Sequence, residues 1–264
     1  MTAIYLNGAT LMTTPTPRVL EIARETGYAG IEARAERLLK DAAEVRATAG
    51  MVRPRDVLTL NGVALTVQAD GRMARRLIED DLKPRLRICQ DLGAPYLLAI
   101  PPRAPGLETR RAVPATRDAL ELARDRADRL GIRIAFEFLG FGDCPINTPA
   151  IAAETVDGID GIQLVLDSCH WHASGGQPLD GYPVDRLALV HLNDAPAKPP
   201  RQIEDEDRLL PGEGVIKLAE LIRELANGGY AGPWSLETFN PAYWKEEPAA
   251  VARRGFDAVF STLT

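Results

Sequence analysis

Four side chains that could bind a cation follow short apolar runs in the second half of the chain: Glu137, Asp167, His191 and Glu237. A carboxylate is costly to bury unless it is paired or bound to a cation. Taken singly, each residue has an ordinary explanation, a salt bridge for a carboxylate or a hydrogen-bonded core residue for histidine. Together they offer the nitrogen and oxygen ligands of one divalent ion, and Mn, Mg, Co and Zn all suit such a set.

Two further polar residues are candidates for binding a substrate. His170 comes three residues after Asp167, so it lies just past the same apolar run and could donate a hydrogen bond to a substrate oxygen. Arg208 follows the four acidic residues 204–207 and could hold another oxygen. The alternatives are an ordinary loop histidine and a surface ion pair.

This set of residues suits proton transfer next to a carbonyl group. A divalent ion that contacts a ketone and the neighbouring hydroxyl acts as a Lewis acid and makes the adjacent C–H acidic. Glu137 and Glu237 could then serve as general base and general acid. The intermediate would be a cis-enediolate, and its reprotonation gives isomerisation at the neighbouring carbon or epimerisation on the opposite face.

The elements that must position these residues form a repeating pattern. Short apolar runs alternate with amphipathic segments of helical periodicity from one end of the chain to the other. The expected strands are residues 4–6, 30–33, 57–61, 96–100, 132–139, 163–167, 187–193 and 232–238. Eight such repeats in 264 residues predict an α/β fold of the (β/α)8 barrel type, whose active site lies where the strands end. A doubly wound open sheet is the alternative, but no G-x-G-x-x-G follows the first strand.

Helical spacing is clearest around residues 78–89, 120–130 and 218–225, and a last helix is expected over residues 248–263. Gly131 is expected to cap the second of these helices. We find no linker or low-complexity tract, so a single domain is predicted. The polar segment 195–208 is expected to form a loop, either mobile above the site or simply exposed.

Bulk composition excludes several classes of protein. The net charge of −6 argues against a nucleic-acid partner. No apolar run approaches membrane-spanning length, and the first residues do not read as a signal peptide. Three cysteines without a C-x-x-C motif favour reduced thiols and a cytoplasmic protein.

Several segments resemble the xylose isomerase-like barrel superfamily, and within it the inosose (2-keto-myo-inositol) isomerases. They are residues 136–140 (FEFLG), 144–148 (CPINT), 164–173 (LVLDSCHWHA), 205–214 (DEDRLLPGEG) and 240–244 (NPAYW), with a looser likeness at 30–34 (GIEAR). The resemblance implies one barrel domain over residues 1–264, one divalent metal and a polyol or sugar ketone as substrate. It assigns the metal to Glu137, Asp167, His191 and Glu237, catalysis to Glu137 and Glu237, and substrate binding to His170 and Arg208. Homo-oligomers are common in the family, and the sequence does not fix the state of this chain.

Other activities share these motifs. A ketose 3-epimerase is close, although members of that group carry a glutamate where this chain has Asp143, one methylene shorter. A lyase similar to 3-dehydroshikimate dehydratase would use related enolate chemistry. An endonuclease IV-like repair enzyme needs more histidines than the three present. The non-enzymatic alternative is a barrel that binds a polyol, and retention of both glutamates argues against it.

Overall fold

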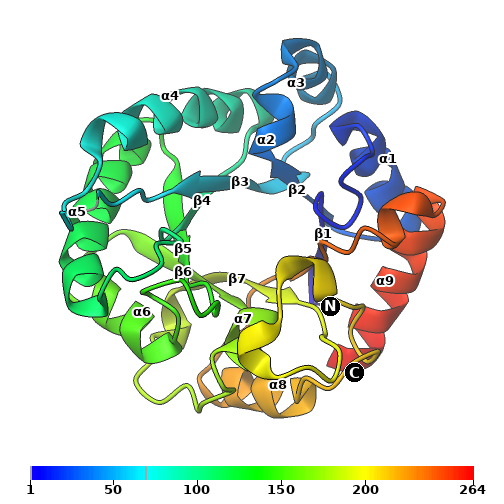
Figure 1. Ribbon diagram of the computed structural model, residues 1–264. Coiled ribbons are helices and arrows are strands. Elements are labelled where there is room, and N and C mark those ends of the chain that lie inside the picture. Colours follow the sequence, from blue (N-terminus) through cyan, green and yellow to red (C-terminus); the bar gives the residue numbers. More distant parts are fainter. Residues whose placement is uncertain (1, 69) are drawn as a thin grey trace.

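The computed structural model describes residues 2–68 and 70–264 as a closed barrel of eight parallel strands surrounded by helices (Figure 1). Each strand pairs with its neighbours in sequence, and β8 closes the ring on β1. The strands are β1 (Ile4–Asn7), β2 (Gly30–Arg34), β3 (Val57–Ala64), β4 (Tyr96–Ile100), β5 (Arg133–Glu137), β6 (Ile162–Asp167), β7 (Leu187–Leu192) and β8 (Trp234–Leu236). The predicted (β/α)8 fold is therefore confirmed.

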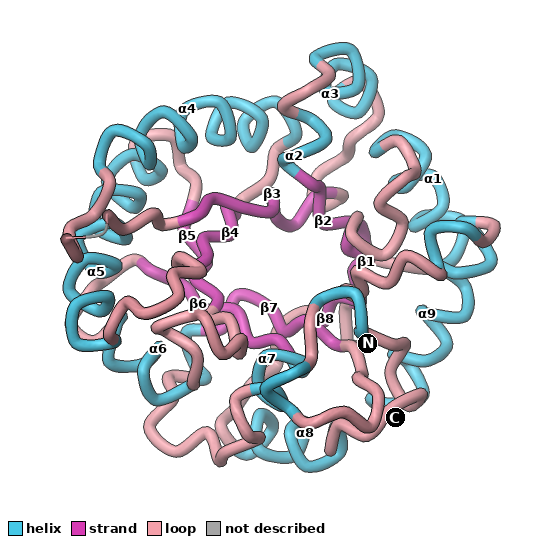
Figure 2. Tube along the Cα trace, viewed as in Figure 1, coloured by secondary structure: helices cyan, strands magenta, loops and turns pink. Residues whose placement is uncertain are grey.

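Helices form the outer layer and cover the sheet on all sides (Figure 2). They are α1 (Thr16–Thr26), α2 (Ala35–Leu38), α3 (Ala42–Ala49), α4 (Arg75–Leu92), α5 (Thr109–Asp128), α6 (Pro149–Val156), α7 (Ser168–Ala173), α8 (Leu218–Asn227) and α9 (Pro248–Leu263). Helix α9 packs against α1 and β1 and so closes the outer ring, as the apolar pattern at the end of the chain predicts.

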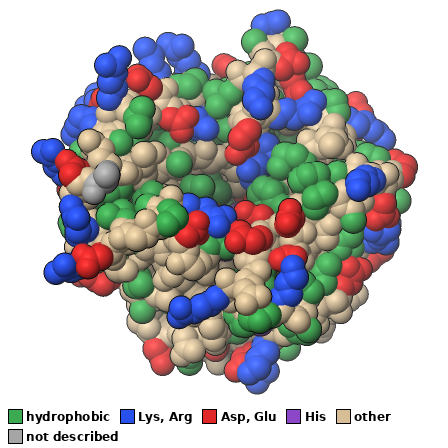
Figure 3. Space-filling view, in the orientation of Figure 1, with side chains coloured by type: hydrophobic (Ala, Val, Ile, Leu, Met, Phe, Trp, Pro, Cys, Tyr) green, Lys and Arg blue, Asp and Glu red, His purple; other side chains and the backbone are tan. Residues whose placement is uncertain are grey.

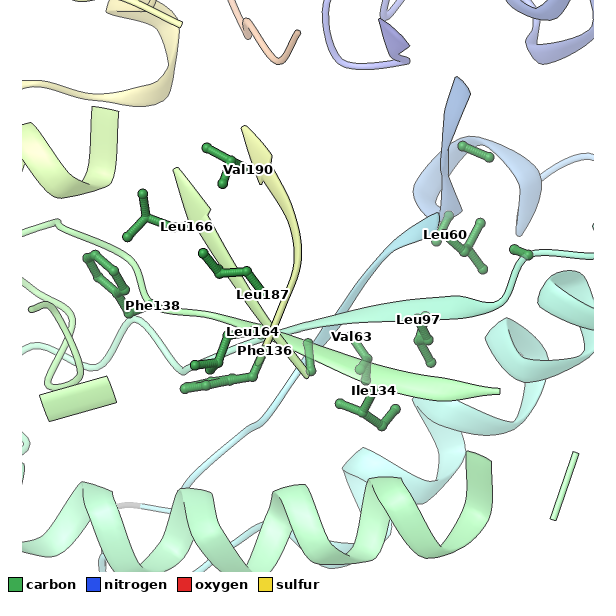
Figure 4. Close-up of a cluster of buried hydrophobic side chains, with 14 of the residues drawn as sticks. Leu60, Val63, Leu97, Ile134, Phe136, Phe138, Leu164, Leu166, Leu187 and Val190 are labelled. Carbon is green, nitrogen blue, oxygen red and sulfur yellow. The ribbon is translucent and has the colours of Figure 1, made fainter. Parts of the chain in front are cut away.

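Alternation along each strand decides which side chains meet the helices and which face the barrel axis. Ile134, Phe136, Leu164 and Leu166 belong to the large apolar cluster between strands and helices (Figure 4). The residues between them, such as Ala135 and Val165, form a separate small cluster inside the barrel. Because side chains alternate with a period of two, the polar residues that end these strands point to the interior.

All eight expected strands are present, but some boundaries differ. The last strand was expected over residues 232–238 and contains only Trp234–Leu236, so Glu237 lies one residue past it. Gly131 caps the helix before it, as predicted: α5 ends at Asp128, Gly131 is left-handed (φ 69°), Gly131 N donates to Asp128 O at 3.1 Å, and Ile132 N donates to Ala127 O at 3.1 Å, which is the Schellman pattern. Across the described residues, no helix combines the length and apolar composition that crossing a bilayer requires.

Candidate metal centre and substrate cavity

The four predicted ligands converge inside one end of the barrel. Glu137 ends β5, Asp167 ends β6, His191 is the fifth residue of β7, and Glu237 follows β8. Each offers one ligand atom, and these atoms lie within 4.8 Å of one another. All four side chains are buried. The structure thus brings together the residues that the sequence predicts, and their role as metal ligands remains a proposal.

The chemistry of this cluster fits a divalent cation. Three carboxylates share one buried volume with the imidazole of His191, whose Nδ1 lies 2.8 Å from Glu137 Oε1 and 3.3 Å from Glu237 Oε2. Buried carboxylates so close together repel one another unless positive charge lies among them. A mixed nitrogen and oxygen donor set is the kind that Zn²⁺, Mn²⁺ and similar ions accept.

Electrostatics distinguishes the carboxylates of the cluster. Burial, reinforced by the neighbouring Glu237 and Asp167, raises the pKa of Glu137 to about 7 despite the attraction of His191. Burial also raises the pKa of Glu237. For Asp167, burial acts to raise the pKa, but Arg208, the two neighbouring histidines and a backbone hydrogen bond from His170 together lower it. Glu137 and Glu237, whose pKa is raised towards neutral pH, are suited to proton transfer. Asp167, which stays ionised, is suited to binding a cation.

Arg208 and His170 lie beside the cluster, as predicted. Arg208 Nη1 donates to Asp167 Oδ2 (2.9 Å) and Glu237 Oε2 (2.7 Å), and Nη2 lies 3.1 Å from His170 Nε2. A guanidinium group has only donors, so His170 Nε2 is the acceptor and Nδ1 carries the hydrogen. Within residues 2–68 and 70–264, that Nδ1–H has no partner. Burial lowers the pKa of His170 to about 4, so the ring is a neutral donor at pH 7.

A cavity of about 340 Å³ opens over these residues. Figure 3 shows the hollow near the middle of this face, with acidic and basic side chains around it. Its polar wall includes Glu137, Glu237, His170, Arg208 and Arg34, and its apolar wall includes Leu98, Ile100, Pro101, Leu139, Phe141 and Phe239. Such a mixture, in a volume of this size, is typical of a small-molecule site.

The segment 195–208 reaches this cavity with its last residues. Asp205 and Arg208 both line the cavity, and Arg208 Nη2 donates to Asp205 Oδ1 at 2.7 Å. Two short 3₁₀ helices, Pro200–Gln202 and Asp205–Asp207, interrupt the segment. The expected loop above the site is therefore present at its C-terminal end.

Three buried residues of the site were not predicted from the sequence. Glu32 contacts His191, Asn7 contacts Glu237, and Asn193 donates to Asp167 Oδ2 at 2.7 Å. The segment GIEAR at residues 30–34 contained the signal for Glu32, because its alternation places Glu32 and Arg34 on the same face of β2. Burial acts to raise the pKa of Glu32, but the nearby His191 and hydrogen bonds from Ser235 and Thr59 act more strongly and lower this pKa to about 2.

Comparison with known proteins agrees with this architecture. Residues 20–260 match the family model for the xylose isomerase-like TIM barrel. The chain belongs to this family. It is 30% identical over 264 residues to an inosose isomerase of Bacillus velezensis, a match that covers 92% of this chain and 91% of the relative. The family resemblance seen in the sequence is confirmed.

Two more matches bear on the site. A solved structure of the IolI protein with a bound zinc atom superposes with a TM-score of 0.88 and 26% identity, covering 100% of this chain and 98% of that one. A 3-dehydroshikimate dehydratase of Pseudomonas aeruginosa is 33% identical over 132 residues, which cover 48% of this chain and 21% of the dehydratase. The comparisons identify this chain as an enzyme of the isomerase and epimerase type.

Proposed function

We propose that this protein is a divalent-metal-dependent isomerase of cyclic polyol ketones of the inosose type. The observation that supports it most is the convergence of Glu137, Asp167, His191 and Glu237 beside a cavity that Glu137 and Glu237 line, in a chain similar over nine-tenths of its length to an inosose isomerase. A divalent cation held by these four residues would polarise the ketone oxygen as a Lewis acid.

The reaction needs one proton removed and one delivered. One glutamate takes the proton from the hydroxyl-bearing carbon next to the ketone, and the electron pair left behind forms the double bond of an enediolate. The other glutamate gives a proton to the former carbonyl carbon, while a proton moves between the two oxygens. The ketone has then shifted by one carbon. Glu137 and Glu237 suit these roles because burial raises the pKa of both.

The remaining polar groups would hold the oxygens in place. His170 is neutral, with an unpartnered Nδ1–H in the described part of the chain, so it would donate to a substrate hydroxyl. Arg208 is 1% exposed and held by Asp167 and Glu237, so its position is fixed before substrate arrives. Such preorganised donors stabilise negative charge as it develops on an enediolate oxygen.

The charges around the cavity favour a neutral substrate over a carboxylic acid. Among the described lining residues, every arginine already has a carboxylate partner: Arg34 pairs with Glu36, Arg103 with Asp143 and Glu204, and Arg208 with Asp167, Glu237 and Asp205. A substrate such as 3-dehydroshikimate carries a carboxylate that would compete with one of these pairs. A polyol ketone needs no such cation.

The environment of Asp143 argues against a 3-epimerase. Arg103 Nε donates to both carboxylate oxygens of Asp143 at 2.9 Å, and Asp143 is absent from the described residues that line the cavity. The aspartate that replaces the additional epimerase glutamate is therefore committed to an ion pair.

A direct test is to incubate the metal-loaded protein with inosose in heavy water and follow the products by NMR. We expect the ketone to move to the neighbouring carbon, with deuterium at the carbon that gains hydrogen. Turnover of 3-dehydroshikimate or of open-chain ketohexoses in preference to inosose would contradict the proposal. Isomerisation without any deuterium would contradict the proton-transfer step.

A further inference from the structure

A second buried carboxylate lies directly behind the histidine of the proposed metal centre. Glu32, on β2, has no exposed surface, and its Oε1 lies 3.0 Å from His191 Nε2. The other ring nitrogen, Nδ1, faces Glu137 at 2.8 Å. The imidazole is therefore held between Glu32 on one side and the ligand cluster on the other.

Glu32 receives hydrogen bonds from three other strands. Asn7 Nδ2 donates to its Oε1 at 3.0 Å, Thr59 Oγ1 donates to its Oε2 at 2.5 Å, and the Ser235 hydroxyl also donates to Oε1. A carboxylate with this many donors is held as an acceptor-only anion in a fixed orientation. The bond at His191 therefore requires a hydrogen on Nε2.

The orientation of Asn7 supports the same assignment. Its Oδ1 accepts from the backbone N–H of Ala9 at 2.9 Å, and a backbone N–H can only donate. The amide nitrogen must then face the carboxylates, where it lies 3.0 Å from Glu32 and 2.9 Å from Glu237. One amide thus fixes both the carboxylate behind His191 and one of the proposed metal ligands.

We propose that Glu32 is a positioning residue, which holds His191 with Nδ1 turned towards the cation site and strengthens that nitrogen as a ligand. A carboxylate that accepts from the second ring nitrogen fixes the tautomer and makes the ligand more basic. This inference rests on the proposed function, because it assumes that His191 binds a metal. A purely structural role for Glu32 would instead affect stability and leave metal affinity unchanged.

Two variants separate these roles. Glu32→Gln keeps the shape and one carbonyl acceptor but removes the charge. Glu44→Gln is the matched control, because Glu44 is also a buried glutamate that accepts from Thr16 N and Oγ1 at 2.7 Å, yet it lies on the outer helix α3. After chelator treatment, each protein is titrated with Zn²⁺ against a chromophoric competitor, and Co²⁺ spectra are recorded.

We expect Glu32→Gln to weaken Zn²⁺ binding by about 10–100-fold and to alter the Co²⁺ spectrum, while Glu44→Gln stays close to wild type. Equal affinity of Glu32→Gln and wild type would overturn the inference and leave the proposed function intact. A wild-type protein that binds no divalent ion would overturn the proposed function itself.

A measurement on the wild-type protein decides the question if Glu32→Gln does not fold. The chain has three histidines, so ¹⁵N-histidine labelling gives a simple spectrum. In the Zn²⁺-loaded protein we expect His191 to carry its hydrogen on Nε2, and ¹¹³Cd²⁺ to couple to Nδ1. Metal coupling to Nε2 would overturn the inference.

Discussion

Replacing Glu237 by glutamine tests the proton-transfer chemistry with little effect on the fold. General acid–base catalysis contributes about 10²–10⁴-fold to a rate, which corresponds to roughly 3–5 kcal/mol of activation free energy. Glu237→Gln removes a carboxylate that takes up or delivers a proton while keeping the side-chain shape, so we expect turnover of inosose to fall by about that factor. The assay is NMR of ketone movement and deuterium uptake in heavy water.

The effect on stability can be estimated from the surroundings of Glu237. Its carboxylate accepts from Arg208 at 2.7 Å and from Asn7 at 2.9 Å, and losing an ionic hydrogen bond costs about 1.5–3 kcal/mol. Burial also disfavours the ionised form, since the pKa of Glu237 is raised, and glutamine removes that penalty. Because these effects oppose each other, we expect the net loss of unfolding free energy to stay below the cost of one such hydrogen bond, about 3 kcal/mol.

Asp167→Asn is the control, because Asp167 is a proposed ligand without a role in proton transfer. Its activity should follow its metal content and recover in part with excess metal, whereas Glu237→Gln should remain inactive even at full metal occupancy. Glu237→Gln turning over inosose at more than a tenth of the wild-type rate per bound ion would refute the assignment.

Three more predictions follow from the buried groups. Burial lowers the pKa of His170 to about 4, so below pH 6.5 the unfolded chain takes up a proton at this histidine more readily than the folded protein does. The unfolding free energy should therefore fall by up to roughly 3 kcal/mol between pH 6.5 and pH 4. Urea unfolding should show this loss in wild type and not in His170→Asn. Burial raises the pKa of Cys89 to about 12 and of Cys144 to about 11, and raises that of Cys169 as well, so the folded protein should react slowly with a disulfide reagent at pH 8 and rapidly in denaturant. Metal at 100 times its Kd should raise the unfolding free energy of the chelator-treated protein by about 2.7 kcal/mol, and an unchanged Tm would contradict binding to the folded state.

The ends of the strands could be predicted from the sequence because they combine two local signals. Glu137 and Asp167 each follow three apolar residues, and parallel strands in a barrel bring their C-terminal ends to one rim. The period of two then places both side chains on the inner face. Neither step depends on contacts between distant parts of the chain.

Residues behind the ligands escaped prediction because their partners are far away in sequence. Glu32 and His191 are 159 residues apart, and Asn7 and Glu237 are 230 apart. The local sequence Ile31-Glu32-Ala33 does not show which residue Glu32 contacts, because that contact forms only in the folded barrel. The sequence also did not define the strand boundaries sharply. Glu237 directly follows the last residue of β8, Leu236, which pairs with Leu6 of β1.

The central claim is that Glu137, Asp167, His191 and Glu237 hold one divalent cation beside the cavity. Crystals grown with Zn²⁺ or Mn²⁺ and measured at the absorption edge of the metal test it directly. The account predicts a single anomalous peak at about 2.0–2.3 Å from one atom of each of the four side chains. A peak elsewhere in the protein, or none among these residues at saturating metal, would contradict it.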